Sequence, residues 1–186
     1  MHLNNKYYIL RHGEALSNVR EVMSCWPEKF ENLLTGLGRE MIKVAAETLN
    51  KKGIDLIFAS DVLRTKQTAE IVSEKLNLPV NFDKRLREVD FGSFNGKAVL
   101  ELDEYFKKES DRIKNSIPGG ESYEKILKRI NDFLKEIDSK YQGKNILVVT
   151  HGFFWWILKS IINGVSLLEA IEQDREIHTG EIKELN

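Results

Sequence analysis

The sequence predicts an α/β fold: a mainly parallel β-sheet with helices on both faces, arranged as a three-layer sandwich. Two observations predict it. Short apolar runs alternate with longer stretches of helical hydrophobic spacing along most of the chain. The apolar runs are nearly continuous, as in parallel strands buried on both faces. The 186 residues suffice for one domain with a sizeable core, and no linker or low-complexity segment divides residues 1–186.

Strands are expected where aromatic and branched residues form short runs without helical spacing. The clearest run is NILVVT at 145–150, and the first run of the chain ends directly before Arg11. The predicted strands are 6–10, 54–59, 79–82 and 145–150, with one or two edge strands at 176–179 and 181–185.

Helices are expected where apolar residues recur on one face. Thr35 can cap the first helix, Ser60 and Asp61 the second, and Ser122 the longest. The predicted helices are 35–52, 60–76, 98–115, 122–141 and 153–162. The predicted inner face of 35–52 consists of Leu37, Met41, Val44, Ala45, Thr48 and Leu49, and that of 98–115 of Leu102, Tyr105 and Phe106.

Composition excludes several functions. Lys and Arg total 28 against 29 Asp and Glu, a balance that argues against a dedicated nucleic-acid binder. A single cysteine, Cys25, excludes an intrachain disulfide and a Cys-based zinc cluster. The first residues lack a signal-peptide pattern, and the longest strongly apolar run, 152–158, is too short to span a bilayer. We therefore expect a soluble cytoplasmic protein with no nucleic-acid or membrane partner; no oligomeric state is assigned.

The segment 19–34 has no clean period and contains Pro27, which predicts an irregular loop. It follows directly on the Arg11–His12–Gly13 turn, so we expect it to cover a site there. Cys25 lies in this loop and is interpreted as a small apolar filler. His178, near the chain end, is interpreted as a surface residue.

Candidate site residues follow the ends of strands 6–10, 55–59 and 145–149. In a parallel sheet these ends share one edge, where α/β folds build their sites. This edge brings together Arg11, His12, Arg64 and His151, with Ser17, Asn18 and the helix after Gly152 as further hydrogen-bond donors.

Arg64 falls in the first turn of its helix, where a cation is disfavoured by a few tenths of a kcal/mol up to about 1 kcal/mol. The placement makes sense if an anion lies at that helix end and is bound by the arginine and the backbone N–H groups together. An arginine that turns into water or pairs with Asp61 remains the alternative.

Two arginines and two imidazoles suit a dianionic tetrahedral group, most simply a phosphate, because the guanidinium fork binds two oxygens at once. The sequence has neither a P-loop nor a carboxylate pair with magnesium-ligand spacing, so metal-free chemistry without a cofactor is expected, and a two-histidine metal site is the weaker alternative. A neutral His12 can then act as nucleophile and form a phosphohistidine, since nearby Arg11 and Arg64 disfavour its charged form.

A leaving alkoxide also needs a proton. Glu88, in the turn-rich loop 84–96, is the expected donor, provided that burial raises its pKa. The apolar segment 153–162 is expected to be a buried helix, with Phe153 alone close enough to His151 to line a pocket.

Six motifs occur in order: RHGEALSN (11–18), LTGLGRE (34–40), SDVLRTKQTA (60–69), LREVDFGSFNG (86–96), PGGES (118–122) and VTHG (149–152). Together they resemble the histidine phosphatase superfamily, the phosphoglycerate-mutase-like group. The resemblance implies that fold for the whole chain, His12 as the phosphorylated nucleophile and Glu88 as the general acid. It also implies a phosphate pocket of Arg11, Arg64 and His151, with Asn18 assisting.

Within this family the sequence is closer to the phosphatase branch. Cofactor-dependent mutases carry an insertion with paired arginines, whereas 98–115 has only Arg112, and Phe153 stands where mutases tend to carry Asn. The expected activity is hydrolysis of a small phosphomonoester. A cofactor-dependent phosphoglycerate mutase and a non-catalytic phosphate-binding module remain as alternatives.

Overall fold

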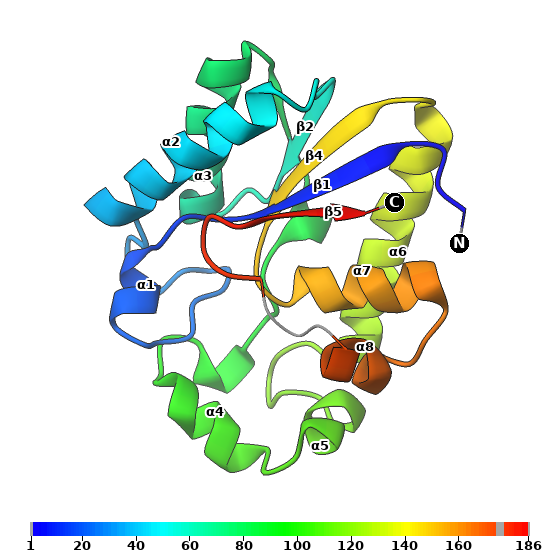
Figure 1. Cartoon of the computed structure of the whole chain (residues 1–186). Helices are drawn as coiled ribbons and strands as arrows, with labels where there is room; N and C mark the ends of the chain where they lie inside the picture. The colour runs from blue at the N-terminus through cyan, green and yellow to red at the C-terminus, as the bar shows by residue number, and fades with distance from the viewer. Residues whose placement is uncertain (1, 174–176, 186) are drawn as a thin grey trace.

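The computed structural model describes residues 2–173 and 177–185 and confirms the predicted three-layer architecture (Figure 1). A five-stranded sheet forms the middle layer, with the order β3 (Val80–Phe82), β2 (Leu56–Ala59), β4 (Asn145–Thr150), β1 (Lys6–Arg11) and β5 (Ile182–Leu185). The first four strands of this order are parallel, and β5 pairs antiparallel with β1 at the edge. In this register Leu10 and Ala59 both lie beside Val149, so three strands end at one edge of the sheet.

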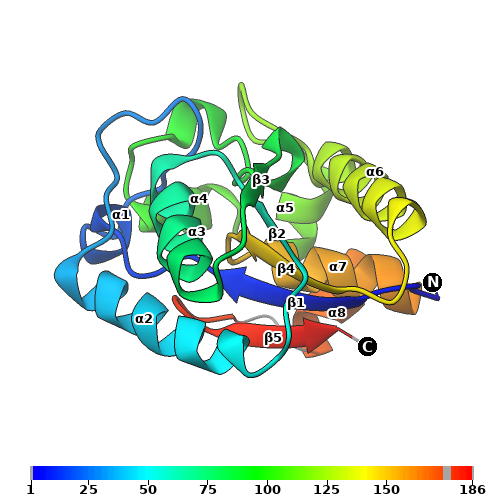
Figure 2. The same ribbon diagram turned by 90° about the horizontal axis from the view of Figure 1, so that it is seen from above.

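Alternate residues of each strand point into two separate apolar layers. Tyr8 and Leu10 face α2 (Gly36–Asn50) and α3 (Leu63–Leu76), whereas Tyr7 and Ile9 face α6 (Tyr123–Lys140) and α7 (Phe154–Asn163). Figure 2 shows these helix pairs on opposite sides of the sheet. Both faces of the central strands are therefore buried, as their continuous apolar sequence predicted.

Four short helices complete the fold: α1 (Leu16–Val19), α4 (Val99–Tyr105), α5 (Glu109–Lys114) and α8 (Leu167–Gln173). The single helix predicted at 98–115 is wrong, because the chain breaks after Tyr105 and Phe106 ends α4 with non-helical dihedral angles. Leu102 and Phe106 are buried as expected, but Tyr105 is 56% exposed. Helix α8 was not predicted.

The predicted inner face of α2 is only partly right: Ala45 and Leu49 are buried as expected. Leu37 and Val44 are exposed, and the buried stripe consists of Gly38, Ile42, Ala45, Ala46 and Leu49. The physical reason is close packing: Gly38 lies directly against the backbone of Glu14, which turns the side of the helix with the small residues inward.

Two further expectations need correction. Neither Ser60 nor Asp61 caps α3, whose N-cap is Val62 without a side-chain hydrogen bond, because both side chains bind other partners. The edge strand predicted at 181–185 corresponds to β5. The edge strand predicted at 176–179 is not observed: residues 177–179 form no strand, and residue 176 lies outside the described residues.

No single helix of the described chain is long and apolar enough to cross a membrane; α7 and α8 reach that length only as a pair, and they are bent by 116°.

The turn that follows β1 is held between α2 and α3 by close backbone contact. Gly13 N donates to Thr68 Oγ1 of α3 at 3.2 Å. A side chain on Gly13 would collide with Gly38 O, and one on Gly38 would overlap the carbonyl of Glu14. Two glycines therefore let the turn pack directly on the start of α2, and this contact fixes the position of His12.

We expect Gly38→Ala to lower the free energy of unfolding by about 1–3 kcal/mol, because the added methyl group must displace the Glu14 backbone. Gly36→Ala in the same helix turn is the control, since nothing lies within 4 Å of its added Cβ. That variant should be unchanged or more stable by up to about 1 kcal/mol. Urea unfolding of the two variants measures both values, and an equal effect would contradict the close-contact account.

Candidate active site

The ends of β1 and β4 place two histidines side by side. His12 N donates to Thr150 O at 3.0 Å, which continues the strand pairing by one residue. The rings of His12 and His151 then lie 5.3 Å apart, centroid to centroid, at 65°. Both side chains are buried. The sequence prediction that these two strand ends would converge agrees with this geometry.

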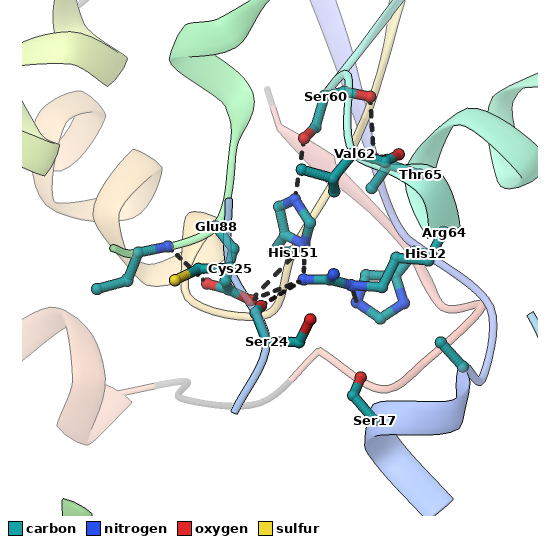
Figure 3. A network of polar contacts seen from close by, with 12 residues as sticks. His12, Ser17, Ser24, Cys25, Ser60, Val62, Arg64, Thr65, Glu88 and His151 are labelled. Carbon is teal, nitrogen blue, oxygen red and sulfur yellow. Dashed lines mark hydrogen bonds and ion pairs between the residues drawn. The ribbon is translucent and has the colours of Figure 1, made fainter. Parts of the chain in front are cut away.

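Arg64, from the first turn of α3, occupies the centre of the site and is 2% exposed (Figure 3). Its Nε donates to His12 Nε2 and its Nη2 to His151 Nδ1, both at 3.1 Å. Nη2 also donates to Ser24 O, and Nη1 to Glu28 Oε1, both at 3.0 Å. Neither sequence alternative for Arg64 holds, because it is neither in water nor paired with Asp61, which pairs with Arg87 instead.

These contacts fix the tautomers of both imidazoles, because a guanidinium only donates and a carbonyl only accepts. His12 Nδ1 lies 2.8 Å from Gly13 O and must carry the proton, so Nε2 presents a lone pair. His151 Nδ1 presents its lone pair to Arg64, and its Nε2–H lies 3.0 Å from Ser60 Oγ. Ser60, predicted to cap a helix, therefore orients His151.

Burial and positive neighbours keep both imidazoles neutral. Burial is the larger cause that holds the pKa of His12 well below its usual range, and the charges of Arg64 and Arg11 add to it. The pKa of His151 is lowered in the same way, by burial first and then by Arg64. At neutral pH His12 therefore presents an unprotonated nitrogen.

Glu88 faces this pair from the loop after β3. Its Oε2 lies 3.6 Å from His151 Nδ1 and 3.9 Å from Arg64 Nη2, and its Oε1 accepts from Val89 N at 3.0 Å. Burial raises the pKa of this carboxyl, although Arg64 opposes the shift. A proton donor at this position needs a raised pKa, and burial shifts the pKa of Glu88 in that direction.

The loop that carries Glu88 is fastened to the rest of the site. Thr150 Oγ1 donates to Leu86 O at 2.9 Å, and Arg129 Nη2 to Glu88 O at 3.3 Å. Two ion-pair bonds hold Arg129 on Glu121. The backbone of the Glu88 loop is therefore held by the strand that delivers His151 and by α6.

An inner cavity of about 230 Å³ lies over these groups and is lined by Arg11, His12, Ser17, Asn18, Ser24, Arg64 and Glu88, among others. Ser17 Oγ accepts from Asn32 Nδ2 at 2.8 Å, and Asn18 Oδ1 accepts from Ala15 N at 2.9 Å. Ser24 Oγ is buried and has no hydrogen-bond partner among the described residues. An anion in this cavity could accept a hydrogen bond from the Ser24 hydroxyl.

A second, outer cavity of about 450 Å³ shares Arg11 and Glu88 with the first. Gly152 and Phe153 line it, as expected, and Gly152 allows the Arg11 guanidinium to lie against the backbone. The prediction that Phe153 alone of its helix would line a pocket is wrong, because Trp156, one turn further along, also lines it. Other lining residues include Phe91, Arg112, Tyr123, Ile177 and His178.

Several residues that the fold brings to the site were not predicted from the sequence: Ser24, Glu28, Ser60 and Arg112. His178 is exposed, as expected, and lies at the outer cavity. Ser24 and Glu28 lie in the loop 19–34, which covers the inner cavity as expected, but no spacing singles them out. Cys25 in the same loop is buried, and burial raises the pKa of its thiol to about 12. This agrees with its interpretation as a filler.

No group of three or more His, Cys, Asp or Glu side chains that could hold a metal ion occurs within residues 2–173 and 177–185. The donor set of the site is cationic and imidazole-based, with Glu88 as the carboxyl beside the two histidines. This set suits a phosphate better than a divalent cation.

Comparison with known sequences places the chain in a family. The profile of the histidine phosphatase superfamily (branch 1) matches residues 7–185. A putative phosphoserine phosphatase 2 of Hydrogenobacter thermophilus is 29% identical over 167 residues, 87% of this chain and 80% of that protein. A probable phosphoglycerate mutase GpmB of Salmonella newport is 31% identical over 163 residues, 85% of this chain and 74% of that protein.

Solved structures show the same fold. A mycobacterial glucosyl-3-phosphoglycerate phosphatase in complex with VO3 superposes with a TM-score of 0.85 at 24% identity, over 97% of this chain and 92% of that chain. The alpha-ribazole phosphatase from Shigella flexneri gives a TM-score of 0.83 at 22% identity, over 97% and 90% of the two chains. Because the family profile matches residues 7–185, which include all the site residues described above, the chain belongs to the histidine phosphatase superfamily.

Proposed function

We propose that this protein is a metal-independent phosphomonoester hydrolase that acts on a small phosphorylated metabolite through a phosphohistidine at His12. One observation carries the proposal: the Nδ1–H bond to Gly13 O leaves the lone pair of His12 Nε2 beside the Arg64 fork, with Glu88 across the site. A nucleophile, an oxyanion clamp and a proton donor thus surround one cavity.

The substrate phosphate would occupy the inner cavity against Arg11, Arg64 and the hydroxyl of Ser24. Each cation contributes about 4 kcal/mol of attraction at an effective dielectric constant of about 20, before desolvation is subtracted. As phosphate oxygens accept from Arg64 Nε and Nη2, these donors leave the imidazoles, and the lone pair of His12 Nε2 becomes available for in-line attack.

In the first step, His12 Nε2 forms a bond to phosphorus while the ester P–O bond breaks, and Glu88 gives its proton to the departing alkoxide. In the second step, water attacks the phosphohistidine, Glu88 takes a proton from that water, and Nε2 leaves with its electron pair restored. Glu88 thus ends protonated, and the products are an alcohol and inorganic phosphate.

Relatives and fold neighbours support the substrate class. They are named as a putative phosphoserine phosphatase, a glucosyl-3-phosphoglycerate phosphatase and an alpha-ribazole phosphatase. The outer cavity of about 450 Å³ offers room for the organic part of such a metabolite.

A phosphoglycerate mutase is the second candidate, because a relative of 31% identity is named as a probable one. Against it, α4 and α5 and the segment between them supply a single arginine, Arg112, and Phe153 lines the outer cavity next to His151. An apolar group there favours release of the alcohol over its retention for a second phosphoryl transfer.

His12→Ala should reduce the rate of hydrolysis of p-nitrophenyl phosphate on the order of 10⁴-fold or more, because the variant lacks the nucleophilic imidazole. Steady-state kinetics in the presence of EDTA measure the effect. His2→Ala, at an exposed position, serves as control and should retain full activity. Retained turnover in His12→Ala would move the nucleophile elsewhere, and loss of wild-type activity on chelation would contradict the metal-free mechanism.

The pH dependence should be bell-shaped. His12 must be neutral, and since its pKa is lowered, activity rises as pH passes a value well below 6.5. Glu88 must be protonated, and since its pKa is raised, activity falls as pH passes a value above its ordinary 4.5. Glu88→Gln should abolish this alkaline limb and slow alkyl phosphates about 10²-fold or more, with a smaller effect on p-nitrophenyl phosphate. Equal slowing of both substrates would argue against the acid role.

Hydrolase and mutase predict different products from 3-phosphoglycerate. We expect release of inorganic phosphate whether or not 2,3-bisphosphoglycerate is added, because α4 and α5 carry one arginine where mutases carry a pair, and the apolar Phe153 does not favour retention of a carboxylate substrate for rephosphorylation. A phosphate-release assay combined with product analysis by NMR distinguishes the two. Formation of 2-phosphoglycerate that depends on the bisphosphate would favour the mutase.

A further inference from the structure

Glu28 is a nearly buried carboxylate at the site that the proposed reaction does not use. Its side chain is 11% exposed and comes from the irregular loop between α1 and α2. Oε1 accepts from Arg64 Nη1 at 3.0 Å, and Oε2 lies 3.3 Å from the backbone N of Leu63, the first residue of α3. One carboxylate therefore binds both the helix end and the arginine.

The contacts of Glu28 explain why an arginine is tolerated in the first turn of α3. A cation there is unfavourable unless an anion neutralises it. The sequence suggested a ligand anion, yet the carboxylate of Glu28 satisfies the same two donors from within the chain. The helix end is thus occupied, and a phosphate must bind elsewhere on the guanidinium.

The donors of Arg64 divide into two groups. A guanidinium has five N–H donors, and protein acceptors take four of them in this structure. Nε and Nη2, which form one fork of the planar group, face His12 and His151, whereas Nη1 faces Glu28. The fork that matches two phosphate oxygens therefore points into the site, and Glu28 holds the opposite corner.

We propose that Glu28 is the positioning residue for Arg64: it anchors the Nη1 corner so that the Nε–Nη2 fork stays aimed at the phosphoryl group on His12. This rests on the proposed function of the same site. Glu28 touches no reacting atom, and its role is to fix the direction of the guanidinium and to offset its charge.

The charge has a separate consequence. The ionisable groups that act on Arg64 are Arg11, His12, Cys25, Glu28, Glu88 and His151, and Arg129 also acts on Glu88. Of the carboxyls, Glu28 is the closer to Arg64, at 3.0 Å against 3.9 Å for Glu88. Without Glu28, the full positive charge of Arg64 acts on Glu88 and favours its ionised form.

The test replaces Glu28 by Gln, which keeps the shape and one acceptor oxygen but removes the charge. We expect kcat for p-nitrophenyl phosphate to fall about tenfold to a hundredfold, because the guanidinium is no longer held in its productive direction. Binding of inorganic phosphate, measured by calorimetry, should not weaken, since the site becomes more positive. The alkaline limb of the pH profile should move to lower pH, because Glu88 loses its proton more readily.

Two matched variants accompany it. Glu28→Asp keeps the charge with a shorter reach and should restore the alkaline limb to its wild-type position while kcat stays reduced. Glu31→Gln removes an exposed carboxylate from the same loop and should behave as wild type. If Glu28→Gln does not fold, Glu28→Asp still tests the proposal, which then requires a lower kcat with an unshifted limb.

A readout without turnover separates this proposal from the proposed function. The ¹⁵N relaxation of Arg64 Nε–H should show an ordered guanidinium in the wild type and a mobile one in Glu28→Gln. An inactive wild type would refute the hydrolase but not this ordering. For Glu28→Gln, unchanged order together with unchanged kcat, or a loss of kcat without any shift of the alkaline limb, would overturn the role of Glu28. For Glu28→Asp, an unchanged kcat would overturn it.

Discussion

The site depends on one constraint: the guanidinium of Arg64 is buried at 2% exposure and must be satisfied by fixed partners. An unpaired buried charge costs several kcal/mol, so the surrounding chain has to supply acceptors in matched positions. Two neutral imidazoles, a carbonyl and a carboxylate do so. Burial first, and then the charge of the same cation, lowers the pKa of His12 and of His151 and keeps both unprotonated, which is the state that a phosphoryl acceptor needs.

The fold meets this constraint by bringing distant segments to one sheet edge. Parallel pairing of β1 and β4 sets the two histidines beside each other. Helix α3, which follows β2, the other neighbour of β4, supplies Arg64. The contact between Gly13 and Gly38 sets the height of the turn that carries His12. Two cavities adjoin this edge: an inner one over His12 and Arg64, and a larger outer one lined in part by aromatic side chains, with Arg11 and Glu88 among the residues that line both.

The sheet, its helical layers and the proximity of Arg11, His12, Arg64 and His151 could be predicted from the sequence, because hydrophobic pattern locates the strands and parallel strands end at a common edge. The strand order was not predicted. It did not reach Ser24 or Glu28, since side chains in an irregular loop are placed by tertiary packing that has no period. The position of Arg64 in a first helical turn predicted an anion at that helix end, and the carboxylate of Glu28 lies there. The sequence could not identify Glu28, because it lies 36 residues away from Arg64. The inner face of α2 was misassigned at Leu37 and Val44 for a related reason: backbone contact at Gly38, and not apolar content, decides which side is buried.

In the proposed reaction, His12 carries the phosphoryl group between substrate and water. The most direct measurement is mass spectrometry of protein quenched in alkali during turnover of a phosphomonoester, followed by mapping of the modified peptide. The account predicts a single acid-labile phosphoryl adduct on the peptide that contains His12. An adduct on any other residue, or an unmodified protein during rapid turnover, would contradict it.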